Sequence, residues 1–400
     1  MEMKKYKLGE IADFVDEKIS SSSISLDEYV TTDSLLQDKR GRTTAQNLPP
    51  QPCNLTRFKK GDVLIGNIRP YLKKIWFADI EGGCSLDVLA LRAKKEAESA
   101  YLYSLLMQDD FFTFVMKAPK GSKMPRGDKN HILTYPCFDI QHKIEVGKFI
   151  KSLDDKIALN RRINAKLEAM AKRLYYHWFV QFDFPGADGK PYKSSDGKME
   201  YNATLKREIP AGWEVGNLYD IAEYVNGLAC QNYRPKESEK SLPVIKIREM
   251  NEGITADTEK VSASIPGKYR IYAGDILFSW SASLEIKIWT GETGGLNQHI
   301  FKVIPKGYFS KGYVYQQLSA YLVNFQKMAE SRKTTMGHIT SDHIKQSRIL
   351  IPPKEIISAF TKKTLSIFNY QLSIEKETTK LTALRDRLLP LLMNGQVEVK

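Results

Sequence analysis

Two loops of similar composition carry the side chains that are best suited to chemistry in this chain. Residues 119–130 and 331–338 are both rich in Lys or Arg, in Ser or Thr, and in Gly. Arg and Lys neutralise phosphates or bond to guanine, hydroxyl and backbone N–H groups bond to phosphate, and Gly allows a close approach. One such loop would be interpreted as an ordinary solvated loop, but two at matching positions favour contact with nucleic acid. The candidate contacts are Lys120, Ser122, Lys123, Met124, Arg126, Lys129, Arg332, Lys333, Thr334, Thr335 and His338.

A second pair of loops follows two matched Gly-Asp segments. Only the first loop is basic, with Asn67, Arg69 and Lys73, whereas the second offers Ser281. Because the side chains differ, the two loops would recognise different base sequences if both contact DNA.

No motif for catalysis accompanies these loops. The sequence has no Gly-x-x-x-x-Gly-Lys-Ser/Thr phosphate loop, no Gly-x-Gly-x-x-Gly after a strand and no His-Glu-x-x-His. Pro52-Cys53 and Pro136-Cys137 resemble the Pro-Cys of cytosine methyltransferases, but no Gly-rich cofactor motif accompanies either pair. We therefore expect a chain without catalysis of its own and interpret these cysteines as packing residues.

Metal binding and paired-carboxylate chemistry are not indicated either. His338 and His343 are the closest histidines, and five residues on a helix place them off a common face. Asp109-Asp110 and Asp154-Asp155 are adjacent acids on predicted helices, where neighbours point in different directions, so we expect them to be solvated. No metal site is predicted.

Composition limits the class of protein. The chain has 400 residues and 42% hydrophobic residues, so two or more domains are expected. No apolar run is long enough to cross a membrane, and the sequence does not start with a signal region, which favours a cytoplasmic protein with no membrane partner. A formal net charge of +13 favours a polyanionic partner, and nucleic acid is the commonest.

An internal repeat organises the chain. Matching landmarks recur at a displacement of 210 to 213 residues. They are the pairs Leu8–Ala12 and Leu218–Ala222, 61–64 and 274–277, Ile75-Trp76 and Ile288-Trp289, Gly82-Gly83 and Gly294-Gly295, and Met124 with His131-Ile132 and Met336 with His343-Ile344.

Each half of the repeat ends in a heptad seam, with residues at alternating steps of four and three. Polar residues at several seam positions suit a partner helix that is chosen for its register. Two such helices can bury their seams against each other if they run antiparallel, which places the domains at opposite ends. The seams are Leu153, Ile157, Asn160, Asn164, Leu167, Ala171, Leu174 and Trp178, and Ile367, Gln371, Ile374, Thr378, Leu381, Arg385, Leu388 and Leu392, with Tyr370 and Leu384 widening the second stripe.

The predicted fold class is α+β, with two tandem, pseudo-twofold-related domains of mixed α/β structure separated by two long antiparallel coiled-coil helices. A small hairpin at Asp196-Gly197 is expected in the linker. The predicted boundaries are 1–140 for the first domain, 141–182 for the central helix, 183–208 for the linker, 209–353 for the second domain and 354–395 for the C-terminal helix.

The whole chain resembles the specificity subunit of type I restriction-modification systems. The resemblance rests on the repeat, on the paired Gly-Asp-Ile/Val-Leu segments, on Gly-Ser-Lys-Met-Pro-Arg-Gly-Asp-Lys at 121–129, and on Trp178-Phe179-Val180 with the segment 189–195. It implies two target recognition domains, each of which reads one half of an asymmetric bipartite site in double-stranded DNA. It also implies two methyltransferase subunits that modify adenine with S-adenosylmethionine, and restriction/translocase subunits that use ATP and Mg, so that no cofactor binds this chain.

Two other functions remain open. A self-contained DNA methyltransferase would need the cofactor and catalytic motifs that the sequence lacks. A non-catalytic scaffold with a coiled-coil seam and incidental basic loops would show no salt-dependent affinity for duplex DNA.

Overall fold

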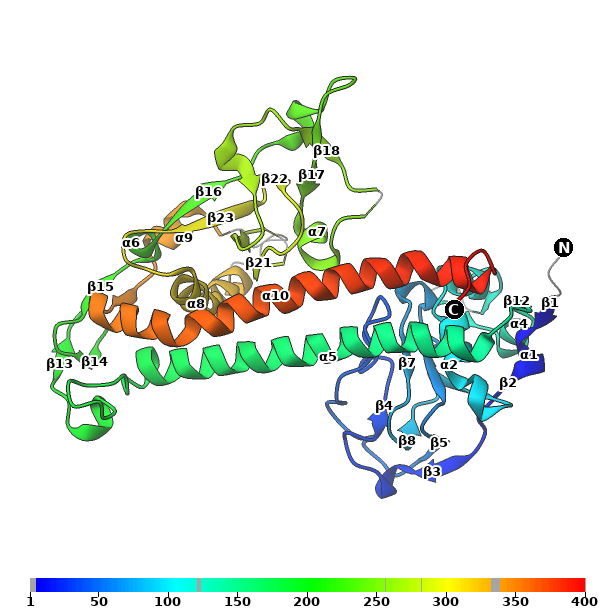
Figure 1. Ribbon diagram of the computed structural model, residues 1–400. Helices are drawn as coiled ribbons and strands as arrows, with labels where there is room; N and C mark the ends of the chain where they lie inside the picture. Colours follow the sequence, from blue (N-terminus) through cyan, green and yellow to red (C-terminus); the bar gives the residue numbers. More distant parts are fainter. Residues whose placement is uncertain (1–4, 121–123, 256, 282, 332–338, 400) are drawn as a thin grey trace. The chain divides into compact units, whose positions relative to one another are not determined.

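The chain folds into two compact units. The computed structural model describes residues 5–399 except 121–123, 256, 282 and 332–338. Unit 1 comprises Met1–Arg161 with Lys380–Lys400, and unit 2 comprises Arg162–Thr379. The long helices α5 (Lys143–Tyr175) and α10 (Lys354–Met393) each contribute to both units, as the green and the orange-to-red ribbons of Figure 1 show. Unit 1 is therefore built from an early and a late part of the chain.

Unit 1 contains two four-stranded sheets. The first has the order β2-β9-β6-β7 and is antiparallel, and the second has the order β3-β5-β8-β4, with β4 parallel to β8. Strands β1 and β12 form a ribbon, and β10 and β11 form a hairpin. The elements are β1 Lys5–Lys7, α1 Leu8–Ile11, β2 Ala12–Phe14, β3 Lys18–Ser20, β4 Tyr29–Val30, β5 Asn54–Phe58, β6 Val63–Gly66, β7 Ile75–Phe77, β8 Gly82–Cys84, β9 Val88–Ala93, α2 Ser99–Leu106, α3 Asp109–Val115, β10 Pro119–Lys120, β11 Arg126–Gly127, α4 Lys129–Leu133 and β12 Pro136–Phe138, with 3-10 turns at Ser21–Ser23, Pro70–Leu72 and Glu96–Glu98.

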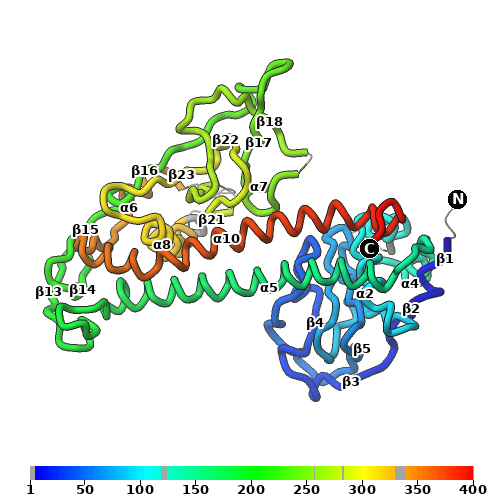
Figure 2. The backbone as a smooth tube through the Cα atoms, viewed as in Figure 1, coloured from blue at the N-terminus to red at the C-terminus, as the bar shows by residue number. Residues whose placement is uncertain are grey.

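Unit 2, most of which Figure 2 traces in green, yellow and orange, repeats the first sheet as β16-β23-β20-β21. Its second sheet, β18-β17-β22-β19, again has one parallel pair, β17 with β22. Its edge strand β18 pairs with a strand of that parallel pair, whereas β3 of unit 1 pairs with the antiparallel strand β5. The additional hairpin β13–β14 of unit 2 precedes the ribbon β15–β24. The elements are β13 Met199–Asn202, β14 Arg207–Pro210, β15 Glu214–Gly216, α6 Leu218–Ile221, β16 Ala222–Asn226, β17 Ser241–Ile245, α7 Ile247–Glu252, β18 Lys260–Ser262, β19 Arg270–Ile271, β20 Ile276–Ser279, β21 Glu285–Ile288, β22 Gly294–Leu296, β23 Ile300–Pro305, α8 Lys311–Ser331, α9 Ser341–Lys345 and β24 Ile349–Ile351, with a π-helical turn at Tyr176–Val180 and 3-10 turns at Lys193–Ser195, Cys230–Tyr233 and Gly267–Tyr269.

The central strand of each first sheet is buried on both faces. Side chains of a strand alternate between its faces. In β6, Val63 and Ile65 join the core under the helices, whereas Leu64 joins a second core on the other face. In β20, Phe278 and Leu277 divide in the same way. The unbroken apolar runs at these two positions are the reason for the strong sequence repeat there.

One landmark of the repeat has a different register from the predicted one. The N–H of Gly61 donates to the carbonyl of Ala78 (2.9 Å), and the N–H of Gly274 donates to the carbonyl of Trp289 (2.6 Å). Trp289 is therefore the counterpart of Ala78, not of Trp76, because the loop after β20 is two residues shorter than the loop after β6. A shift of two residues keeps a side chain on the same face, so both tryptophans remain buried on the side away from the helices.

Every residue of the two predicted seams is buried or half-buried. By contrast, Tyr370 and Leu384, which were expected to widen the second stripe, are 53% and 42% exposed. Within unit 2, the Asn164 amide donates to Glu375 (2.8 Å) and the Gln371 amide donates to Glu168 (3.1 Å). Each step forward along α5 is a step backward along α10, so the two helices run antiparallel.

A buried ion pair lies in the part of the seam that belongs to unit 1. The Arg385 side chain is 2% exposed, and its Nη1 lies 2.7 Å from Oδ1 of Asp154. Tyr103 of α2 donates to the other oxygen of the same carboxylate (2.8 Å). The prediction that Asp154 is solvated is therefore wrong, because the packing of α2 against α5 encloses this carboxylate.

Helix α5 can approach α2 closely because of a glycine. A Cβ atom at Gly147 would lie 2.4 Å from the backbone nitrogen of Tyr101. Any larger residue would push α5 away from unit 1, whose core includes Val146 and Ile150 of the same helix.

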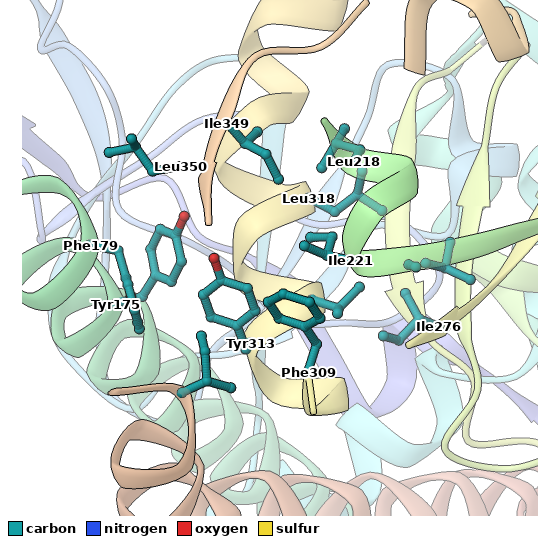
Figure 3. Packing of buried hydrophobic residues seen from close by; sticks show 14 of the residues in the cluster. Tyr175, Phe179, Leu218, Ile221, Ile276, Phe309, Tyr313, Leu318, Ile349 and Leu350 are labelled. Atoms are coloured by element: carbon teal, nitrogen blue, oxygen red, sulfur yellow. The ribbon is translucent and has the colours of Figure 1, made fainter. Parts of the chain in front are cut away.

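The segment predicted as a linker packs against unit 2. Phe184 is buried and stacks on Trp213 with ring centroids 5.3 Å apart. The expected hairpin at Asp196-Gly197 is wrong, because Asp196 ends a 3-10 turn with a positive φ of 60° and the hairpin forms at β13–β14 instead. Figure 3 shows the adjoining core, where Tyr175 and Phe179 of the helix end lie beside Tyr313 of α8.

Candidate nucleic-acid interface

Three segments of unit 1 meet at one end of its first sheet. The N–H of Asn67 donates to the carbonyl of Asp87 (2.8 Å), and the N–H of Arg69 donates to the carbonyl of Pro125 (2.9 Å). Two loops that the sequence singled out are thus brought together with a third segment that it did not. We call them the β6–β7 loop (67–73), the β8–β9 turn (Ser85–Val88) and the β10–β11 hairpin (119–127).

Side-chain contacts hold the hairpin in place. The side-chain oxygen of Asn67 accepts a hydrogen bond from the N–H of Gly127 (3.0 Å), which occupies Asn67 in a structural role. Nη2 of Arg126 lies 2.9 Å from Oδ1 of Asp87, while the Arg126 side chain is 52% exposed. A guanidinium held by a carboxylate on one side and open on the other is suited to bidentate contact with a guanine edge.

The β6–β7 loop is held in a strained backbone conformation. Arg69 and Lys73 have φ angles of 52° and 50°, and Asp38 and Lys39 beside them have 55° and 58°. Such values are uncommon for residues with a Cβ atom and cost of order 1 to 3 kcal/mol each. Strain of this kind persists where other contacts enforce it, and it is frequent at binding sites.

A shared carboxylate stabilises this conformation. Oδ1 of Asp109 lies 2.9 Å from Nζ of Lys39 and 3.0 Å from Nζ of Lys73. Partial burial raises the pKa of Asp109, but the hydrogen bonds and charges of the two lysines outweigh it and hold that pKa below its ordinary value. The Asp109 side chain is 62% exposed, as expected of a solvated acid, and it is also paired with two lysines. Lys73 is engaged in this ion pair, whereas the side chain of Arg69 is exposed.

Unit 2 builds the same junction with different side chains. The N–H of Trp280 donates to the carbonyl of His299 (3.3 Å), and the N–H of Ile339 donates to the carbonyl of Trp280 (3.0 Å). The first bond repeats that from Asn67 to Asp87 in unit 1. The second joins the same two segments as the bond from Gly127 to Asn67, but its acceptor is a backbone carbonyl and not a side-chain oxygen. The indole N–H of Trp280 donates to Asn226 (3.2 Å), and its ring lies 5.6 Å from that of His299. Asp87 of unit 1 thus contacts a guanidinium, whereas its counterpart His299 contacts an aromatic ring.

The predicted contact residues differ in what the structure shows of them. Met124, Arg126 and Lys129 are exposed, and Lys129 also lies over the ring of Phe14, 5.3 Å from its centroid. Ser281 is only 6% exposed, so the expectation that it offers its hydroxyl to DNA is wrong for this conformation. The side chain of Lys120 and the residues Ser122, Lys123, Arg332, Lys333, Thr334, Thr335 and His338 lie outside the part of the structure that is described.

The sequence analysis missed the turn residues of both units. Asp87 and His299 follow the matched Gly-Gly strands, but neither belongs to a motif that a single sequence would reveal. Only their positions 212 residues apart, next to the landmark at Gly82 and Gly294, could have indicated them.

Two other classes of site are absent from the described residues. Within the described residues, no group of three or more His, Cys, Asp or Glu side chains is arranged to hold a metal ion. In the same residues, no helix is both long and apolar enough to cross a membrane.

The sequence is similar to known DNA specificity domains and subunits. A family model described as the type I restriction modification DNA specificity domain matches residues 210–383. The chain is 26% identical over 462 residues to the HindI specificity subunit of Haemophilus influenzae, an alignment that covers 98% of this chain and 99% of that protein. Residues 210–383 thus match the type I restriction modification DNA specificity domain, and almost the whole chain is similar to a specificity subunit of a type I restriction-modification system.

Other members of this class agree. The MjaIX specificity subunit of Methanocaldococcus jannaschii is 24% identical over 373 residues, which is 90% of this chain and 83% of that protein. The crystal structure of a type I S subunit from M. genitalium has the same fold, with a TM-score of 0.59 at 12% identity over 99% of this chain and 96% of that one. The family model covers the sheets of unit 2, and the longer alignments extend the similarity of the specificity subunits to unit 1.

Proposed function

We propose that each unit of this chain reads one half of an asymmetric, bipartite site in duplex DNA. The observation that carries the proposal is the junction that both units form: the backbone hydrogen bond from Asn67 to Asp87 in unit 1 recurs from Trp280 to His299 in unit 2, while the side chains at these positions differ. A backbone arrangement that occurs in both units, with different side chains at one end, suits two units that bind different base sequences.

We also propose a division of labour within a larger complex. In the cytoplasm, the chain would assemble with two methyltransferase subunits that carry S-adenosylmethionine and with restriction/translocase subunits that use ATP and Mg. The chain itself would supply recognition and no catalysis. The support is the similarity of the chain to specificity subunits of type I systems, together with a junction whose described polar groups suit hydrogen bonding to DNA.

The test measures the affinity of the purified chain for duplex DNA as a function of salt concentration. A cation that contacts a phosphate contributes about 0.9 to the slope of log K against log salt, so Arg69→Ala should reduce the slope by about one. Lys60→Ala is the matched control, because Lys60 is an exposed cation that precedes strand β6 whereas Arg69 follows it.

Sequencing of methylated DNA from cells with and without the gene identifies the site itself. A bipartite motif that depends on the gene supports the proposal. Absence of a salt-dependent affinity for duplex DNA would favour a scaffold, and binding of labelled S-adenosylmethionine by the isolated chain would favour a self-contained methyltransferase.

A further inference from the structure

The β8–β9 turn of unit 1 is a rigid support for two side chains. The N–H of Val88 donates to the carbonyl of Ser85 (3.0 Å), which closes a β-turn with Leu86 and Asp87 at its corners. The N–H of Ser85 donates in turn to Val30 of the neighbouring strand (2.9 Å). The backbone at these corners is thus fixed on both sides.

The equivalent turn of unit 2 has the same hydrogen bond. The N–H of Ile300 donates to the carbonyl of Asn297 (3.1 Å), and Gln298 and His299 take the corner positions. Asn297 is 6% exposed, and its side chain accepts from the N–H of His299 (3.3 Å), which braces the turn from inside. Two matching turns therefore carry different corner pairs, Leu-Asp in unit 1 and Gln-His in unit 2.

The corner residue of unit 1 is unusually apolar for its position. Leu86 is 77% exposed, although it stands on a fixed turn from which it cannot fold back onto the core. The two segments bonded to this turn also expose apolar side chains, with Tyr71 at 52% and Met124 at 55%. Exposed apolar side chains on segments that are bonded to one another suit an interaction surface.

Side chains of the types found at the corner positions can contact base edges in the major groove of DNA. An apolar side chain can pack on the C5-methyl group of thymine, and a glutamine can bond bidentately to the edge of adenine. Asp87 holds Arg126 at 2.9 Å, so Leu86 and the guanidinium start from adjacent points of the same junction.

We propose that the two corner pairs are specificity determinants of the two half-sites. Leu86 contacts a thymine methyl group in the first half-site, Asp87 positions Arg126 for a neighbouring guanine, and Gln298 bonds to an adenine in the second half-site. This inference rests on the proposed function and adds the residues that select individual bases.

The experiment uses the full chain co-expressed with its methyltransferase subunits, and measures methylation of the native site and of sites changed at one base pair. Leu86→Ala should lower discrimination at one position of the first half-site about fourfold, because one methyl-sized contact is lost. Gln298→Ala should lower discrimination at one position of the second half-site about 5- to 150-fold. Asp87→Asn should weaken the selection of guanine in the first half-site.

Leu26→Ala is the control for an exposed leucine. It is 40% exposed and lies before β4, at the end of that strand away from the β8–β9 turn, so discrimination should not change. If Leu86→Ala and Gln298→Ala both keep wild-type discrimination at every position, or if either alters the opposite half-site, the inference is overturned. If the wild-type chain produces no bipartite motif, the proposed function itself fails.

Discussion

Replacing Arg385 with methionine isolates the contribution of the buried ion pair in the seam of unit 1. Methionine keeps the unbranched apolar stem but leaves the Asp154 carboxylate without its cation. The side chains of Arg385 and Asp154 are 2% and 16% exposed, so little water can replace the guanidinium. The second partner of Arg385, Asp386, is 45% exposed and contributes little.

The expected loss in the free energy of unfolding of unit 1 is about 3 kcal/mol. Removal of one partner from a buried pair costs about 3 to 5 kcal/mol, and the lower value applies because Asp154 retains some contact with water. For a unit of this size, the loss corresponds to a fall in Tm of about 6 to 12 °C.

A second substitution should recover most of this loss. Asp154→Asn removes the unpaired charge and keeps an oxygen that accepts from the Tyr103 hydroxyl. Burial and the neighbouring carboxylate raise the pKa of Tyr103 well above its ordinary value, so this hydroxyl remains a donor. The double variant should therefore lie within about 1 kcal/mol of the wild-type unit, since a buried pair replaced as a whole is nearly neutral.

Calorimetry of the full chain, together with hydrogen exchange at amides of α2, assigns the transition to unit 1. Arg387→Met, at an exposed position two residues further along α10, is the control. A Tm unchanged by Arg385→Met, or a double variant as unstable as the single one, would refute the reasoning.

Three further predictions concern Arg126, Asp109 and the two long helices. Arg126→Lys should reduce the selection of a base in the first half-site by about 1 to 3 kcal/mol, because lysine cannot make the bidentate bond. If Arg126→Lys and the wild type methylate native and altered sites equally, Arg126 does not contact a base. The lowered pKa of Asp109 means that its carboxylate stabilises the β6–β7 loop above about pH 4 and that this support is lost as the pH falls through the folded-state pKa. The protection factor of the Lys39 amide, which donates to Lys73 (3.0 Å), should therefore fall as the pH drops through the folded-state pKa in the wild type but not in Asp109→Asn. Four residues inserted after Asn164, together with four inserted before its partner Glu375, lengthen both helices by about 6 Å. Methylome sequencing should then show that the gap between the half-sites grows by about one to two base pairs while both half-sites stay unchanged. An unchanged gap would show that the helices do not set the distance.

The helices and the repeat could be predicted from sequence because their signals are periodic. A seam repeated at steps of four and three identifies buried positions without knowledge of the partner, and all sixteen seam residues are indeed buried or half-buried. The width of the second apolar stripe was overestimated, since Tyr370 and Leu384 are exposed to solvent.

The contacts of the junction could not be predicted, because they depend on segments distant in sequence. Ser281 has a polar side chain in a loop, but burial of that loop position removes it from the surface. Asp154 looks like any helix-surface acid until Arg385 and Tyr103 are brought next to it. The β8–β9 turn has no distinctive composition, and only its hydrogen bonds show that it belongs to the same site.

Unit 1 contains residues from both ends of the chain, which affects the order in which the two units fold. Its core includes Leu389, Leu392 and Met393 of α10, whereas unit 2 consists of one continuous stretch, Arg162–Thr379. On the ribosome, the second recognition unit can therefore fold before the first is complete, although the first is translated earlier. A prematurely terminated chain would expose the apolar surface of unit 1 to quality control while its other unit is intact. Recombination that exchanges the early part of the gene must also preserve compatibility with the residues of α10 that complete this core.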